Sequence, residues 1–170
     1  MTLVLISILM GLAAPSWQTF LRNTKSRTLL LQLQLALQFA RQEALLRREV
    51  MTLCGSRDQK SCTASWQEGV IVFIDYKQDG SVESPSHILR VFQFRRLEGV
   101  LHWRAFPLNK SVCQFLPLGT TNHENGSFWY CPASGAEAAW ALVLSQSGRW
   151  RIRYPDHGQI KDDKGIPLSC

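Results

Sequence analysis

Residues 16–49 carry one long helical pattern, and residues 1–14 before them have no charge. Apolar residues recur there in steps of three and four, the spacing of one helix face, at Leu30, Leu33, Leu37, Ala40 and Ala44. Pro15 separates the two parts, and we expect it to kink the helix because the pattern resumes directly after it. A helix from residue 1 to 49 would be about 70 Å long, so part of it must project from a small domain.

The projecting half is the uncharged one. Fourteen apolar residues are fewer than the roughly 20 that cross a bilayer. A cleaved secretory signal remains an alternative, because Leu12-Ala13-Ala14 resembles a cleavage site of small residues. Against it, no Lys or Arg precedes the apolar run. We expect residues 1–21 to lie in lipid or among like helices, with Arg22, Lys25 and Arg27 just beyond the membrane.

After Val50 the pattern changes to short β-type runs separated by turn residues. Eight strands are predicted, at 50–54, 69–75, 88–95, 99–105, 112–116, 127–131, 139–145 and 149–154. We therefore predict an α+β fold in which the helix, ending at about residue 49, packs its leucine face on one sheet of an antiparallel two-sheet domain. The globular part would span residues 22–154, and residues 155–170 would be a flexible tail fixed only by Cys170.

The five cysteines favour disulfides over a metal site, since no CxxC pair or zinc-type Cys/His spacing occurs. Cys54 and Cys62 flank a short polar segment that a bridge could close. Cys131 is a reasonable partner for the terminal Cys170, which leaves Cys113 as a buried thiol. Spacing does not fix the connectivity, and five reduced thiols remain the alternative.

No catalytic or cofactor-binding motif is recognisable in the sequence, so we expect no enzyme activity, metal or cofactor. A nucleophile built from Cys113 and a histidine is the weaker alternative. The segment from Asp75 to Gly80 lacks the spacing of a calcium loop. Its Asp79-Gly80 pair is instead typical of a hairpin turn.

The segment from Gly148 to Tyr154 alternates arginine with large apolar residues. In a strand, Arg149, Arg151 and Arg153 share one face, with roots about 6.7 Å apart. We expect the opposite face, formed by Trp150, Ile152 and Tyr154, to be anchored in the core. The arginine face fits either a phosphate-bearing partner or a solvated strand edge, and the residues alone do not decide between them.

Several segments, taken in order, resemble the GspH/FimT group of type IV minor pilins and type II secretion pseudopilins. They are residues 12–17, 40–44, 50–54, 66–69, 72–75, 89–90 and 148–151. The resemblance implies a type IV pilin-like fold. Members of the group begin with a basic leader, a processing site and a Phe-Thr-Leu-x-Glu segment, so we expect about seven mature residues before Met1, which would extend the apolar run to about 21.

The resemblance also implies a function. FimT-like minor pilins carry a Gly-Arg-x-Arg motif whose arginines bind DNA, and here it falls on Gly148, Arg149 and Arg151. Arg153 is added because it shares their face. We therefore expect a minor pilin that binds extracellular duplex DNA regardless of sequence, for uptake in natural transformation. The alternative is a pseudopilin of type II secretion, or a pilus-priming subunit, that binds no DNA.

The same resemblance implies partners and a location. The N-terminal helix would contact other major and minor pilins. The subunit would first be held in the bacterial inner membrane by a single pass, with its globular domain in the periplasm. It would then move into the pilus at the cell surface.

Overall fold

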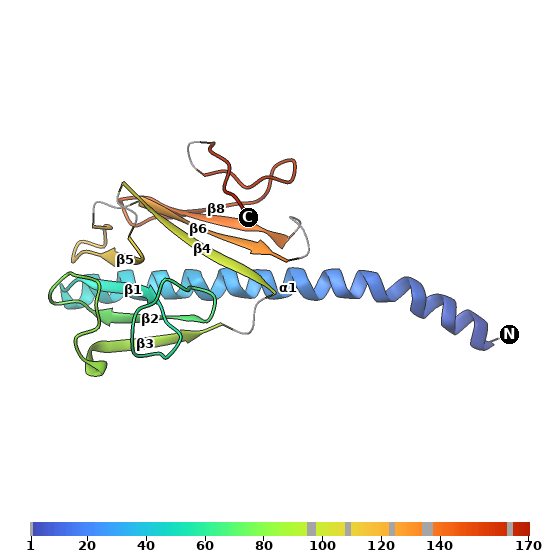
Figure 1. Ribbon diagram of the computed structural model, residues 1–170, viewed down its shortest axis with the longest axis horizontal. Helices are drawn as coiled ribbons and strands as arrows, with labels where there is room; N and C mark the ends of the chain where they lie inside the picture. The colour runs from blue at the N-terminus through green and yellow to red at the C-terminus, as the bar shows by residue number, and fades with distance from the viewer. Residues whose placement is uncertain (1, 95–97, 108–109, 123–124, 134–137, 163–164) are drawn as a thin grey trace.

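A computed structural model of the 170-residue chain describes residues 2–94, 98–107, 110–122, 125–133, 138–162 and 165–170, with side chains from residue 17 onward. One helix, α1 (Thr2–Arg47), continues through Pro15 and projects far beyond the sheets (Figure 1). It ends where Arg48 takes a positive φ of 57° and its N–H still donates to the Ala44 carbonyl at 3.0 Å. Within the described residues, no helix combines the length and hydropathy of a membrane span.

In the described part of the chain, eight strands follow the helix, as the sequence predicts, and they form two antiparallel sheets. The strands are β1 (Met51–Gly55), β2 (Gly69–Ile74), β3 (Ile88–Gln93), β4 (Gly99–Phe106), β5 (Val112–Phe115), β6 (Asn125–Pro132), β7 (Trp140–Leu144) and β8 (Trp150–Arg153). A short 3₁₀ turn, η1 (Pro85–His87), precedes β3. Sheet 1 has the order β3-β2-β1-β5, and sheet 2 has the order β4-β6-β7-β8. Strand ends agree with the prediction to within two residues.

The helix shares one core with both sheets. All five residues of its predicted leucine and alanine face are buried, which confirms that face. They lie in one cluster with Met51 and Val72 of sheet 1 and with Phe128 and Leu142 of sheet 2. The predicted packing on one sheet was therefore incomplete. Figure 1 shows α1 running between β1–β3 on one side and sheet 2 on the other.

Sheet 1 is buried on both faces at its centre. Every residue of β1 is buried, and β2 is a nearly continuous apolar run. A second cluster on the face away from the main core contains Cys54, Ile71, Phe73 and Val112, and the disulfide partner Cys62 packs against it. Burial on two faces explains why β2 reads VIVF without polar alternation.

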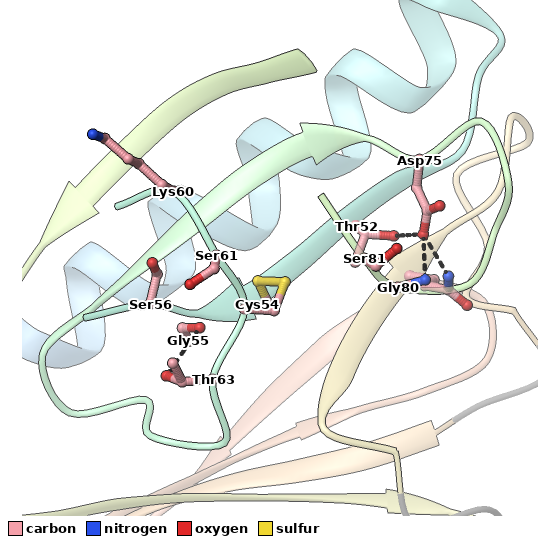
Figure 2. Close-up of a disulfide and its surroundings, with 12 residues drawn as sticks. Thr52, Cys54, Gly55, Ser56, Lys60, Ser61, Thr63, Asp75, Gly80 and Ser81 are labelled. Atoms are coloured by element: carbon pink, nitrogen blue, oxygen red, sulfur yellow. Dashed lines mark hydrogen bonds between the residues drawn. A yellow bond between two sulfur atoms is a disulfide. The ribbon is translucent and has the colours of Figure 1, made fainter. Parts of the chain in front are cut away.

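A buried carboxylate fixes the loop after β2 (Figure 2). Asp75 is 1% exposed, and its Oδ2 accepts hydrogen bonds from Thr52 Oγ1 at 2.7 Å, Gln114 Nε2 at 2.9 Å and the Gly80 N–H at 2.9 Å. Thr52 lies on β1 and Gln114 on β5, so these contacts tie the loop to both strands. The hydrogen bonds also offset the cost of burying the carboxylate. The predicted hairpin turn at Asp79-Gly80 is wrong, because the pair lies within a long connection that includes η1, between Ile74 and Ile88, and sequence reasoning missed this role of Asp75.

The C-terminal segment lies over the face of sheet 2 that points away from α1, which we call the outer face (Figure 1). Ile160 and Leu168 are buried there against Trp129 and Ala141. The Leu168 N–H donates to the Ile160 carbonyl at 2.8 Å, and Trp129 Nε1 donates to the Ser169 carbonyl at 3.0 Å. The expectation that Cys170 alone fixes residues 155–170 is therefore wrong, since two apolar side chains in a polar stretch are enough to dock it.

Among the described residues, two disulfides are present, Cys54–Cys62 and Cys131–Cys170, and Cys113 is a buried cysteine outside both of them. These are the pairings that the sequence favoured without fixing them. The first closes the loop between β1 and β2, and the second joins the end of the chain to β6. Both disulfides therefore hold segments that lack long β-sheet hydrogen-bond ladders of their own.

Candidate nucleic-acid interface

The turn between β7 and β8 sets the start of the arginine strand. The Gly148 N–H donates to the Ser145 carbonyl at 2.9 Å, and Gly148 has a φ of 71°, which favours glycine. A Cβ atom on Gly148 would overlap the Gly119 carbonyl oxygen, to which Arg41 Nε donates at 3.0 Å. Gly148 is therefore required for a close approach between two loops and the helix, and its main role in the structure is to position β8.

Arg151 and Arg153 lie on one side of β8, Arg149 directly precedes the strand, and all three are exposed. Arg149 Nε donates to the Ser147 hydroxyl at 3.3 Å. Among the described residues, neither Arg149 nor Arg151 forms an ion pair with a carboxylate. Their guanidinium groups are therefore available to an anionic partner, and bidentate contact with phosphate suits their geometry.

The opposite side of β8 is less buried than the sequence predicts. Trp150 is half-buried against the main core, whereas Ile152 is 36% exposed and Tyr154 is 62% exposed. The expectation that all three anchor in the core is wrong for these two. The physical reason is that β8 is an edge strand with β7 as its only neighbour, and Tyr154 lies at a cavity of about 170 Å³ beside α1.

Strand register places the arginine face in line with three other strands on the outer face. Arg151 pairs with Val143, Val143 with Ser127, and Ser127 with Arg104. Arg153 occupies the next line, with Ala141, Trp129 and His102. Cross-strand partners point to the same side of a sheet, so two arginines, Arg104 on β4 and Arg151 on β8, border the same surface.

Arg104 is fixed at the far side of this surface. Its Nη2 lies 3.3 Å from Asp162 Oδ2 of the C-terminal segment, and its guanidinium lies over the Trp129 ring, 5.8 Å from the centroid. In the cross-strand line that begins at Arg153, the His102 ring stacks on the Trp129 ring, with centroids 4.9 Å apart. Burial lowers the pKa of His102, which favours its neutral form.

The structure therefore brings together the predicted arginines and adds neighbours that the sequence did not single out. Arg104 could have been noticed, because it alternates with apolar residues in its strand as Arg149 and Arg151 do. Its alignment with Arg151 could not, because the two strands are separated by β6 and β7. Within the described residues, no group of three or more side chains has a metal-binding arrangement.

A family profile described as Type II transport protein GspH matches residues 30–148, more than half of the chain. The chain belongs to the GspH family. The fold of α1 and two sheets agrees with this membership, and the chain is thus a pilin-like or pseudopilin-like subunit of a structural family. The matched region ends at Gly148, so it does not include Arg149, Arg151 or Arg153.

Solved structures with a similar fold include a type IV minor pilin. Two crystal forms of the type IV minor pilin FimU of Pseudomonas aeruginosa match with TM-scores of 0.56 and 0.55, at 21% and 20% identity. They cover 82% and 78% of this chain and 96% of the FimU chain in each case. The minor pseudopilin EpsH from the type 2 secretion system of Vibrio cholerae matches at a TM-score of 0.45 and 12% identity, over 79% of this chain and 97% of EpsH. A comparison with curated proteins finds no match.

Proposed function

We propose that this GspH-family subunit is a minor pilin that binds extracellular DNA, without sequence preference, for uptake in natural transformation. Arg149 and Arg151 make the contact, with Arg153 beside them and Gly148 fixing the strand. The observation that carries the proposal is that Arg151 on β8 and Arg149 directly before it are both exposed, with no carboxylate partner among the described residues.

Phosphate contacts alone account for the expected binding. Two to three contacts give a slope of log K against log salt of about −1.8 to −2.7 on duplex DNA. The dissociation constant should lie near the non-specific range of about 10⁻⁴ to 10⁻⁶ M, because phosphates carry no sequence information. Several copies along a filament would raise the avidity without any new contact.

The subunit would reach DNA as part of a filament. Trp17, Phe20 and Leu21 lie on the projecting part of α1 with large exposed apolar side chains. We propose that residues 1–21 hold the subunit in the inner membrane and then pack against other pilins. The globular domain would face the periplasm first and the cell surface after assembly.

The test is fluorescence anisotropy of a labelled duplex with the full chain in a mild non-ionic detergent. The double variant Arg149→Ala/Arg151→Ala should weaken binding and make the salt slope shallower by about 1.8. The matched control is Arg57→Ala/Lys60→Ala, which removes the same charge from the exposed loop between β1 and β2. Equal loss in both double variants would mean that net charge, and not this strand, attracts DNA.

A structural role without DNA binding is the second candidate, and the family description, Type II transport protein, favours it. It predicts no measurable affinity for the duplex at any salt concentration. It also predicts that the arginine variants assemble and function as the parent chain does.

A further inference from the structure

The outer face of sheet 2 holds a cavity of about 290 Å³ beside the arginine strand. Its walls come from β4, β6, β7 and the C-terminal segment. The side chains that matter here are Arg104, Phe106, Asn125, Ser127, Val143 and Asp162. Val143 is the register partner of Arg151, so the cavity floor continues directly to the arginine face.

The cavity combines a flat apolar surface with fixed polar groups. Phe106 is 55% exposed, and Val143 forms an apolar floor. Asn125 and Ser127 offer an amide and a hydroxyl, which can each donate and accept hydrogen bonds. Arg104 and Asp162 hold each other at 3.3 Å, so a donor fork and an acceptor carboxylate stand side by side at the wall. These are the groups that recognise the edge and the face of a planar heterocycle.

The charge pattern separates two tasks. Arg104 and Asp162 pair with each other in the wall and offset each other's charge, so the cavity offers a phosphate no unpaired cation, while Arg149 and Arg151 outside it favour one next to it. A neutral base in the cavity, with its phosphates on β8, satisfies both. The volume lies at the lower end of the range for small-molecule sites, about 300 Å³, which suits one ring system better than a larger ligand.

We propose that this cavity accepts an unpaired base of single-stranded DNA whose backbone lies on Arg149 and Arg151. The inference rests on the proposed function and deepens it, because it assigns a strand preference. A paired base presents neither its face nor its Watson–Crick edge, so only an unpaired one can enter. Binding of single strands through a basic surface with aromatic platforms follows the same physical rule in other folds.

The experiment measures anisotropy for three probes with the full chain in non-ionic detergent. The probes are a labelled single strand, a strand of equal length with abasic sites throughout, and the corresponding duplex. The single strand should bind roughly tenfold more tightly than the abasic strand, since stacking on an aromatic ring acts on the base alone. Equal affinity for these two strands would overturn the cavity assignment.

Variants separate the cavity from the arginines. Ile166 of the C-terminal segment also lines the cavity. Phe106→Ala on β4 and Ile166→Ala should each remove most of the base-dependent gain and leave duplex binding unchanged. The matched control is Tyr76→Ala, an aromatic of similar exposure, 53%, in the loop after β2. Unchanged single-strand affinity in both cavity variants would also overturn the inference.

The outcomes distinguish this inference from the function on which it rests. If all three probes bind alike and all weaken in Arg149→Ala/Arg151→Ala, the arginine contact stands and the cavity inference fails. If no probe binds, the proposed function itself fails, and the cavity inference fails with it.

Discussion

The substitution Gly148→Ala tests how the arginine strand is held in place. Gly148 has a φ of 71°, a conformation that costs an L-residue about 1–2 kcal/mol. An alanine Cβ would also overlap the Gly119 carbonyl oxygen, so that loop must move away. The movement breaks the hydrogen bond from Arg41 Nε, and a hydrogen bond of a charged donor contributes about 1.5–3 kcal/mol.

The two effects together predict a loss of about 2.5–5 kcal/mol in the free energy of unfolding. Gly158→Ala is the matched control. Gly158 has nearly the same φ, 76°, but a Cβ there would meet nothing within 4 Å. It should therefore lose only the backbone cost of about 1–2 kcal/mol.

The assay is chemical denaturation of the full chain in detergent, followed by tryptophan fluorescence. Five of the six tryptophans, all except Trp17, lie in the globular part and report on it. The reasoning is refuted if Gly148→Ala and Gly158→Ala lose the same stability, because the close approach to Gly119 would then have no energetic weight.

The two disulfides should differ in their contribution to stability, because Cys131–Cys170 closes a separation of 39 residues and Cys54–Cys62 one of 8. Loop-closure entropy gives about 4 kcal/mol for the first and about 2.5 kcal/mol for the second, so Cys170→Ser should lower the denaturation midpoint more than Cys62→Ser, and the reverse order would contradict the entropic account. Asp58 accepts hydrogen bonds from the N–H groups of Lys60 and Ser61, which hold its pKa well below the usual range. Because the pKa of Asp58 is lower in the folded state, its contribution to stability is present above about pH 4 and is lost as the pH falls through the folded pKa. The measurement is a ¹³C NMR titration of the Asp58 carboxyl group. A midpoint at the ordinary pKa of an aspartate would show that these hydrogen bonds are absent.

Much of the fold follows from local patterns. The three-and-four spacing of Leu33, Leu37 and Ala40 predicts both the helix and its buried face, because helical geometry places those residues together whatever they pack against. The eight strands were recognisable from their β-type runs and turn residues. The alternation from Arg149 to Arg153 likewise fixes which side chains share a face.

The details of the candidate site could not be predicted in the same way. The alternation of side chains along a strand predicts that Ile152 and Tyr154 lie opposite the arginines. Burial also requires neighbouring strands, and β8, at the edge of sheet 2, has one neighbouring strand fewer than a central strand. The alignment of Arg104 with Arg151 depends on three successive registers across sheet 2. The docking of Ile160 and Leu168 depends on where Trp129 lies.

By itself, the sequence determined the periodic features of this protein: a long helix with one apolar face, a series of short strands, and an arginine side on the last of them. Only the tertiary structure decided that Gly148 lies against Gly119, that Asp75 fixes a loop between two strands, and that a cavity opens beside Arg151. The physical reason is range. Periodicity arises from backbone geometry within a few residues, whereas contacts such as these join segments far apart in the chain.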